Sequence, residues 1–176
     1  PESYSLGTRL STDRRKNLFV STRARLWQRP EWNQIDQSIN FRARVRIGSK
    51  FDINHNIDYS SRTNERGYVT RLFDDNNSLN NVVIGVRNVR NLTNTLSSNY
   101  IFTNRMGLTF RLRHYWSRVL YSDYLNLDPN GDLTSLDYNG INPSTGASRH
   151  DRNFNQFNID MEYNWQFKPG SEIRVI

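Results

Sequence analysis

The strongest constraint on this chain is an alternation of apolar and polar residues with a period of two. Across residues 157–167, every odd position is apolar or aromatic and every even position is polar. Residues 39–47, 51–59 and 106–116 follow the same pattern with few exceptions. Because neighbouring side chains of a β-strand point to opposite faces, this period predicts strands that each carry one apolar and one polar face.

The strands are predicted to follow one another as an antiparallel meander. Weaker patterns add strands at residues 4–10, 18–26, 67–73, 81–87, 96–102 and 172–176. Residues 82–102 admit two interpretations, one long strand with a phase slip near Asn88 or two strands joined by a tight turn. Short turns are expected at residues 48–49, 104–105 and 169–170, and longer polar connections at residues 11–16, 28–34, 60–66, 74–80 and 122–152. The prediction is an all-β, up-and-down chain of eight to ten strands without a helix.

Composition excludes several classes of protein. Hydrophobic residues make up 35% of the 176 residues, and no apolar run approaches the ~18 residues of a transmembrane helix. Cysteine is absent, which excludes disulfide frameworks, thiolate zinc sites and cysteine nucleophiles. The net charge is +7, and 21 of the 24 basic residues are arginine, which makes planar, bidentate contacts.

The alternation fits two environments, a soluble sheet with its polar face in water or an outer-membrane barrel with its apolar face in lipid. The long alternating segments match the ~9–11 residues of a membrane-spanning strand. In a barrel, the polar face would line the lumen with charges of both signs: Arg42, Arg44, Arg46, Asp52, Asp58, Arg111, Arg113, Asp160 and Glu162. The aromatic residues near strand ends would form interfacial girdles: Tyr100, Phe102, Tyr115, Trp116, Tyr163, Trp165 and Phe167. We therefore expect a transmembrane β-barrel.

Several segments resemble a known family. The most specific are Arg-His-Tyr-Trp-Ser at residues 113–117 and Pro-Gly-Ser-Glu at residues 169–172, and residues 92–96, 100–102, 106–112 and 157–161 support them. They resemble the C-terminal β-barrel domain, of unassigned function, that follows a family-9-like carbohydrate-binding domain in Gram-negative outer-membrane proteins. The resemblance implies that residues 1–176 form a single barrel domain or a C-terminal fragment of a larger barrel. It also implies that the upstream carbohydrate-binding-like domain is absent here, and it carries over no catalytic residue.

Other candidate sites are weaker. Asp128, Asn130 and Asp132 have the opening spacing of a calcium loop, but Leu133 stands where such a loop needs glycine. Asp160 and Glu162 share a strand face, as a glycosidase pair would, although ion pairing with arginines is favoured. The three histidines, His55, His114 and His150, lack a nucleophile motif.

The function expected from the sequence is a non-catalytic outer-membrane scaffold or conduit with an arginine-rich lumen. Its expected partners are the lipid bilayer and possible glycans or other outer-membrane subunits, with no nucleic acid and no cofactor. Nucleic acid is disfavoured because the arginines alternate inside strands and do not gather on a loop or helix. The alternatives are a soluble glycan-binding module that uses Trp27 and Trp32, and a barrel hydrolase.

Overall fold

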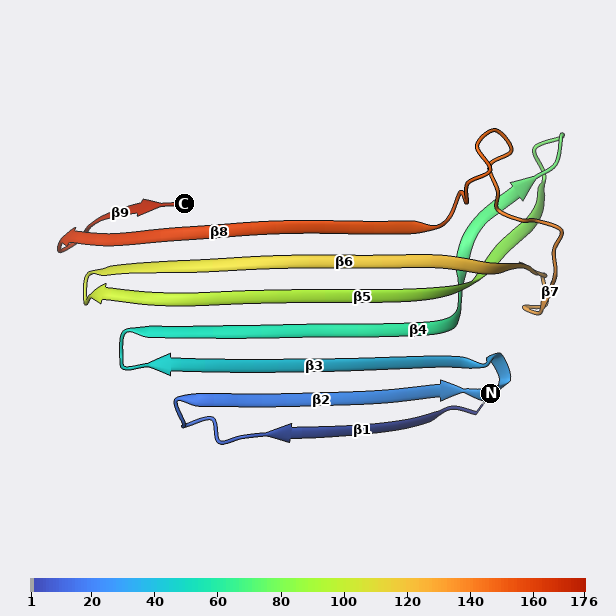
Figure 1. Cartoon of the computed structure of the whole chain (residues 1–176). Helices are drawn as coiled ribbons and strands as arrows, with labels where there is room; N and C mark the ends of the chain where they lie inside the picture. Colours follow the sequence, from blue (N-terminus) through green and yellow to red (C-terminus); the bar gives the residue numbers. More distant parts are fainter. Residues whose placement is uncertain (1) are drawn as a thin grey trace.

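The computed structural model describes residues 2–176, which form one antiparallel sheet (Figure 1). The strand order is β1-β2-β3-β4-β5-β6-β8-β9, and β7 pairs with the end of β6. The strands are β1 Tyr4–Ser11, β2 Leu18–Arg29, β3 Gln34–Ile47, β4 Phe51–Phe73, β5 Leu79–Thr103, β6 Met106–Leu127, β7 Leu133–Ser135, β8 Arg152–Lys168 and β9 Ser171–Val175. The antiparallel meander is therefore confirmed, with nine strands. Its only described helix is the 3-10 turn Pro30–Trp32, and no described helix is long and apolar enough to cross a membrane.

The longest strands resolve one open alternative and correct one prediction. Residues 82–102 lie within a single strand, β5, whose pairing with β6 shifts register between Val86 and Arg87. The connection predicted at residues 60–66 is wrong, because β4 runs through it. Most of its polar residues stay paired with β5, and a register shift between Arg62 and Glu65 leaves Thr63 and Asn64 outside that pairing. Both faces are polar here, so the period-two signal disappears while the backbone pairing continues.

Most of the sheet is a single open layer. Among residues 2–176, β1 and β9 each have one edge without a strand partner. The outer edge of β8 is also open over residues 152–162, because β9 pairs only with residues 163–168. The accessible surface is 12455 Å², against roughly 8,900 Å² expected for a compact monomer of this mass. The barrel expected from the sequence is thus not closed in this structure.

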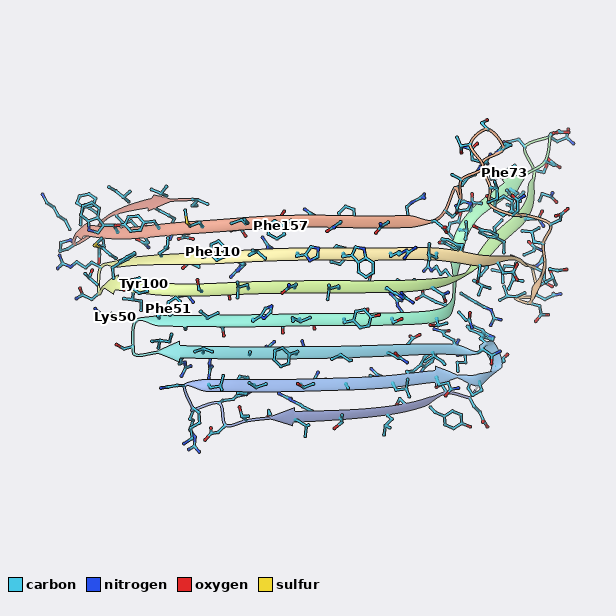
Figure 2. All side chains as sticks on the ribbon, in the orientation of Figure 1. Lys50, Phe51, Phe73, Tyr100, Phe110 and Phe157 are labelled. Atoms are coloured by element: carbon cyan, nitrogen blue, oxygen red, sulfur yellow. The ribbon has the colours of Figure 1, made fainter. Side chains whose placement is uncertain are left out.

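Over the flat part of the sheet, the register places most apolar side chains on one face and most charged side chains on the other. One row of directly paired residues runs Leu18, Val45 and Ile53, and another runs Leu96, Leu112 and Ile159. We call the side on which these rows lie the apolar face and the other the polar face. The apolar face is uncovered: Leu6 is 74% exposed, Ile47 60% and Ile159 57%. Side chains extend from both sides of the sheet (Figure 2).

The small buried core lies mainly at one end of the sheet. There β4 and β5 continue beyond their neighbours and bend away from the sheet, at the same end as the long connection between β6 and β8 (Figure 1). Val83 is fully buried and Tyr124 is 6% exposed. The opposite end carries the short turns at residues 48–50, 104–105 and 169–170, as predicted. The β1–β2 connection, residues 12–17, lies at this same end, whereas the longest connection, between β6 and β8, lies at the other.

Candidate functional site on the polar face

All nine charged residues predicted to share a face lie on the polar face. In the β3–β4 ladder, Arg46 is opposite Asp52, and Asn40 is opposite Asp58. In the β6–β8 ladder, Arg111 is opposite Asp160, and Thr109 is opposite Glu162. The remaining members, Arg42, Arg44 and Arg113, lie an even number of residues away from these on the same strands and therefore point to the same face.

The carboxylates of the polar face have two kinds of partner. On β8, Asp160 accepts from Arg113 at 2.8 Å, and Glu162 pairs with Arg174 at 3.0 Å. On β4, asparagines donate to the carboxylates instead. Asp58 accepts from Asn40 at 2.6 Å and from Asn56, and Asp52 accepts from Asn54 at 2.7 Å and Asn99 at 3.2 Å. Asp52 and Asp58 thus form no ion pair with a described arginine.

Positive charge is concentrated on the polar face of β1, β2 and β3. The arginines that share this face are Arg9, Arg23, Arg25, Arg29, Arg42, Arg44 and Arg46. Asp36 is the carboxylate that lies on the same part of the face, and it accepts from Gln34 at 3.1 Å. None of these seven arginines forms an ion pair with another described residue. The sequence pattern showed each arginine but could not show that three adjacent strands bring them together.

Tryptophan and arginine side chains stack at the connection between β2 and β3. The Arg29 guanidinium lies 5.1 Å from the Trp27 ring and 4.3 Å from the Trp32 ring, and Arg66 lies 4.4 Å from Trp32. Such contacts stabilise by cation–π attraction. Next to them is a hollow of about 350 Å³, lined by Arg25, Trp27, Asp36, Gln37, Ser38, Ser60 and Arg62. No sequence pattern indicated that Arg29 and Arg66 would join this stack.

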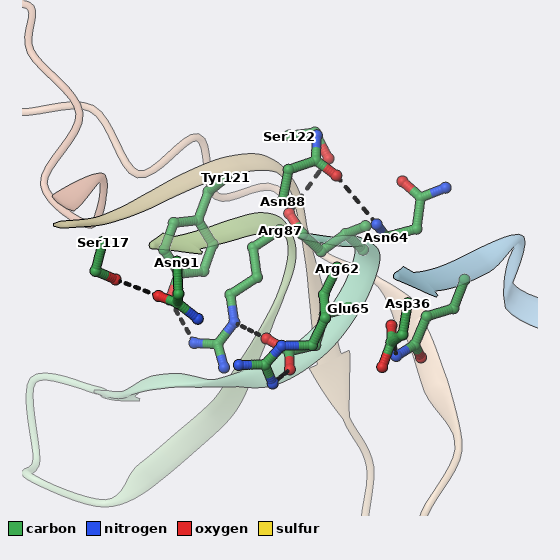
Figure 3. A network of polar contacts seen from close by, with 12 residues as sticks. Asp36, Arg62, Asn64, Glu65, Arg87, Asn88, Asn91, Ser117, Tyr121 and Ser122 are labelled. Atoms are coloured by element: carbon green, nitrogen blue, oxygen red, sulfur yellow. Dashed lines mark hydrogen bonds and ion pairs between the residues drawn. The ribbon is translucent and has the colours of Figure 1, made fainter. Parts of the chain in front are cut away.

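A network of charges holds the bend where β4 leaves the flat sheet (Figure 3). The Glu65 carboxylate accepts from Arg62 and, at 2.8 Å, from Nε of Arg87. Arg87 also donates to the Tyr121 hydroxyl at 3.1 Å. Asn64 adopts the left-handed conformation with φ 57°, and its backbone N–H donates to Asn88 Oδ1 at 3.1 Å. The sequence did not predict this network, because its residues lie in the segment predicted as a connection and on distant strands.

Ring contacts join the long connection between β6 and β8 to the end of β6. Tyr121 and Tyr124 stack with ring centroids 5.7 Å apart, and Tyr138 packs edge-on against Tyr124 at 5.1 Å. His150 Nε2 lies 2.6 Å from the Tyr138 hydroxyl. Burial lowers the pKa of His150, and the nearby Arg152 and Arg149 lower it further. We call these four residues the loop cluster.

Six of the seven aromatic residues predicted to form interfacial girdles lie on the apolar face or beside the short turns. Contacts join the rings at the short-turn end, with Tyr100 4.7 Å from Phe102, Phe102 6.4 Å from Tyr163, and Trp165 5.9 Å from Phe167. Trp116 lies on the same face, further along β6, opposite Leu92. Tyr115 is the exception. Because strand neighbours alternate, it takes the polar face, where its ring lies 5.9 Å from Phe154.

The remaining candidates have local structural partners. Asp128 Oδ1 accepts from the backbone N–H groups of Asn130 at 2.9 Å and Asp132 at 3.0 Å, so the calcium candidate forms the turn between β6 and β7. No group of three or more metal-binding side chains gathers within residues 2–176. His55 bonds Asn94 at 2.6 Å, and His114 bonds Asn155 at 2.8 Å, both on the apolar face.

Comparison with known proteins identifies the family of the chain. Residues 1–176 match a domain of unknown function, DUF5916, and the chain belongs to this family. This agrees with the unassigned-function domain implied by the sequence resemblance. Neither the curated proteins nor the solved structures include a significant match.

Proposed function

We propose that this DUF5916 domain forms the wall of a membrane-spanning β-barrel in the Gram-negative outer membrane and acts as a non-catalytic scaffold or conduit. The apolar face contacts lipid, and the polar face lines a water-filled lumen rich in arginine. The single observation that carries this proposal is the pair of opposed faces on an uncovered, one-layer sheet. In water, an apolar face of this extent needs a second layer to cover it. Lipid supplies that cover directly.

The stagger of the short turns supports the proposal. Phe51, Tyr100 and Tyr163 lie in one row across the sheet, because Tyr100 and Tyr163 are linked through their common neighbour Leu108. Ser49, Asn104 and Pro169 lie two, four and six residues beyond this row. Each successive turn is thus shifted by two residues along the strand direction for every two strands crossed. At ~3.3 Å per residue and ~4.8 Å per strand, the strands are tilted by about 35° from the direction perpendicular to the line that joins the turns. Strands in membrane barrels tilt by a similar angle, roughly 35–45°.

Four polar side chains of the apolar face have hydrogen-bond partners within that face. A polar group without a partner is costly in hydrocarbon. His55 and Asn94 bond each other on this face, as do His114 and Asn155. In the proposed barrel, the open edges of β1 and β9 pair with each other or with further strands, because unpaired strand edges do not occur in lipid.

Adjacent single-cysteine variants test which face meets lipid. The chain has no cysteine, so one introduced thiol is the only one present. In β8, Asn158 lies on the polar face and Ile159 on the apolar face. After reconstitution into phosphatidylcholine vesicles, we expect a water-soluble maleimide to label Asn158→Cys and to leave Ile159→Cys largely unlabelled. A lipid-borne nitroxide should quench a fluorophore at position 159 but not at position 158.

Solubility provides the opposing outcome. If the protein is monodisperse in buffer without detergent, and the maleimide labels both positions equally after mixing with vesicles, then the membrane proposal is wrong. A need for detergent, together with heat-modifiable gel mobility, would support it. The solubility and gel-mobility results are obtained with the wild-type chain, and the labelling result then requires the two cysteine variants.

A second candidate function, glycan binding, is favoured by the hollow beside Trp27. An aromatic ring flanked by a carboxylate, hydroxyls and guanidinium groups offers both an apolar platform and hydrogen-bond partners. Trp27, Asp36 and Arg62 supply these groups from three strands. Maltohexaose and cellohexaose, titrated against tryptophan fluorescence, test the idea. Binding lost in Trp27→Ala but kept in Trp116→Phe supports it, and no response to either sugar refutes it for these glycans.

A further inference from the structure

A small notch on the polar face joins arginines of β1, β2 and β3. Arg9, Arg14, Arg23 and Arg42 line it together with Phe19, Ser21 and Asn40, and its volume is about 110 Å³. Pockets for drug-sized ligands are much larger, roughly 300–1,000 Å³. The notch therefore suits a small charged group and not a whole organic solute.

The floor of the notch is formed by an apolar residue that breaks the alternation. Phe19 lies on the polar face, opposite Arg44, and yet it is 4% exposed. The guanidinium groups of Arg14 and Arg44 lie 5.6 Å and 5.4 Å from its ring. Arg44 also donates to the backbone oxygen of Arg14. These contacts hold the β1–β2 turn over the sheet, so the notch has a fixed wall.

The charges around the notch lack compensation from the protein. None of its four arginines forms an ion pair with a described residue. Asp58, on the neighbouring strand, accepts from Asn40 and Asn56 instead. Arg42 makes only a long contact of 3.5 Å, to Asn56. Four neighbouring cations without a counter-charge repel one another, and an anion in the notch removes that repulsion.

We propose that the notch binds a phosphate group, with Arg23 and Arg42 as its main ligands and Arg9 and Arg14 at its mouth. Guanidinium groups bind phosphate through two parallel N–H···O bonds, which favours arginine over lysine at such sites. The inference rests on the proposed function in one respect, because it takes the phosphate to belong to a solute in the lumen. It thereby names the class of solute that the conduit handles, namely phosphate and phosphorylated small molecules.

Calorimetry on the detergent-purified protein tests the site. Inorganic phosphate and glucose 6-phosphate are titrated at constant ionic strength, with chloride and glucose as the matched controls. We expect both phosphates to bind and both controls to fail. Arg23→Gln and Arg42→Gln should each weaken phosphate binding by at least about tenfold, since a hydrogen bond to a charged group contributes about 1.5–3 kcal/mol.

Two further variants separate a specific site from general positive charge. Arg23→Lys keeps the charge but loses the fork, so it should weaken binding, though less than Arg23→Gln. Arg111→Gln removes an arginine of the same face on β6, outside the notch, and should leave binding unchanged. Equal losses in Arg23→Gln and Arg111→Gln would overturn the proposal, as would absence of phosphate binding in folded wild-type protein.

The source of the phosphate and the membrane proposal are tested separately. If phosphatidylglycerol in vesicles occupies the notch and free phosphate does not, then the lumenal solute is ruled out. If the cysteine labelling pattern holds and phosphate does not bind, then the notch proposal fails alone. If phosphate binds to a protein that is soluble without detergent, then the notch stands as a phosphate site while the conduit fails.

Discussion

The Arg113 guanidinium donates a 2.8 Å hydrogen bond to the Asp160 carboxylate, and the two residues are diagonal neighbours across β6 and β8. The residue directly opposite Asp160 is Arg111, and the one opposite Arg113 is Asn158. One carboxylate thus faces two arginines on the neighbouring strand. Diagonal neighbours lie about 7–8 Å apart, within reach of a long side chain such as arginine.

We expect Asp160→Asn to lower the free energy of unfolding by less than about 1 kcal/mol, because solvent-exposed ion pairs contribute little. The side chains of Arg113 and Asp160 are 50% and 52% exposed. Urea titration of the variant beside wild type measures the change, with Asn158→Gln as a neutral substitution on the same strand. A loss above about 2 kcal/mol would mean that something shields this face from water.

Introducing a charge at Phe110 should distinguish the faces energetically. Phe110 lies on the apolar face opposite Met161, and Thr109 lies beside it on the polar face (Figure 2 labels Phe110). In lipid, Phe110→Arg should lower the free energy of unfolding, by about 2–4 kcal/mol at the bilayer centre and less toward its surface. Thr109→Arg, opposite Glu162, should be nearly neutral. Folding into vesicles, followed by urea titration, provides the measurement. Equal effects at the two positions would contradict a lipid-facing side.

The His55–Asn94 pair should behave as a unit. His55→Leu leaves Asn94 without its partner, so we expect a loss of about 1–3 kcal/mol in lipid. The double variant His55→Leu with Asn94→Leu removes both polar groups and should recover most of that loss. A double-mutant cycle in vesicles measures the coupling. Additive losses would indicate that water reaches both groups, and the apolar face would then not be lipid-facing there.

The alternation predicts a strand well where one of its faces is apolar and poorly where both of its faces are polar. In residues 39–47 and 157–167, one face is apolar, and the alternation fixed strand identity and side-chain direction correctly. In residues 60–66, both faces are polar, so the segment had the composition of a loop although it pairs with β5. Phe19 was missed for a related reason, because an isolated aromatic residue at a polar position gives no sign of the arginines that cover it. Grouping of residues from distant strands depends on register, which a single sequence does not specify.

Removing Glu65 should destabilise the bend of β4 more than the rest of the sheet. Its side chain is 13% exposed and is shared by Arg62 and Arg87, so Glu65→Gln leaves two guanidinium groups close together with a weaker acceptor. We expect a loss of about 1–3 kcal/mol in local stability. Hydrogen exchange should show faster opening of residues 66–87, with residues 39–47 unchanged. Uniform acceleration across both segments would show that the network supports the entire sheet.

The loop cluster should open as the pH falls below about 6.5, the ordinary pKa of histidine. Burial first, and then Arg152 and Arg149, lower the pKa of His150 in the folded protein, while Asp151 opposes them. Between the lowered value and 6.5, the unfolded segment therefore binds more protons, so its stability declines with falling pH by at most about 1.4 kcal/mol per unit. Above that window the histidine is neutral in both states and contributes no pH dependence.

Exchange of the Arg149 amide provides the measurement for this cluster, because its N–H is bonded to the Gly140 carbonyl at 2.8 Å. After correction for intrinsic exchange, protection should fall between pH 7.5 and pH 5 in wild type. His150→Phe keeps a ring against Tyr124 and Tyr138 but cannot titrate, so its protection should be lower and independent of pH. His114→Phe, on the apolar face, should retain the wild-type pH dependence at Arg149. If His150→Phe retains the same pH dependence, then another group controls the opening of the connection.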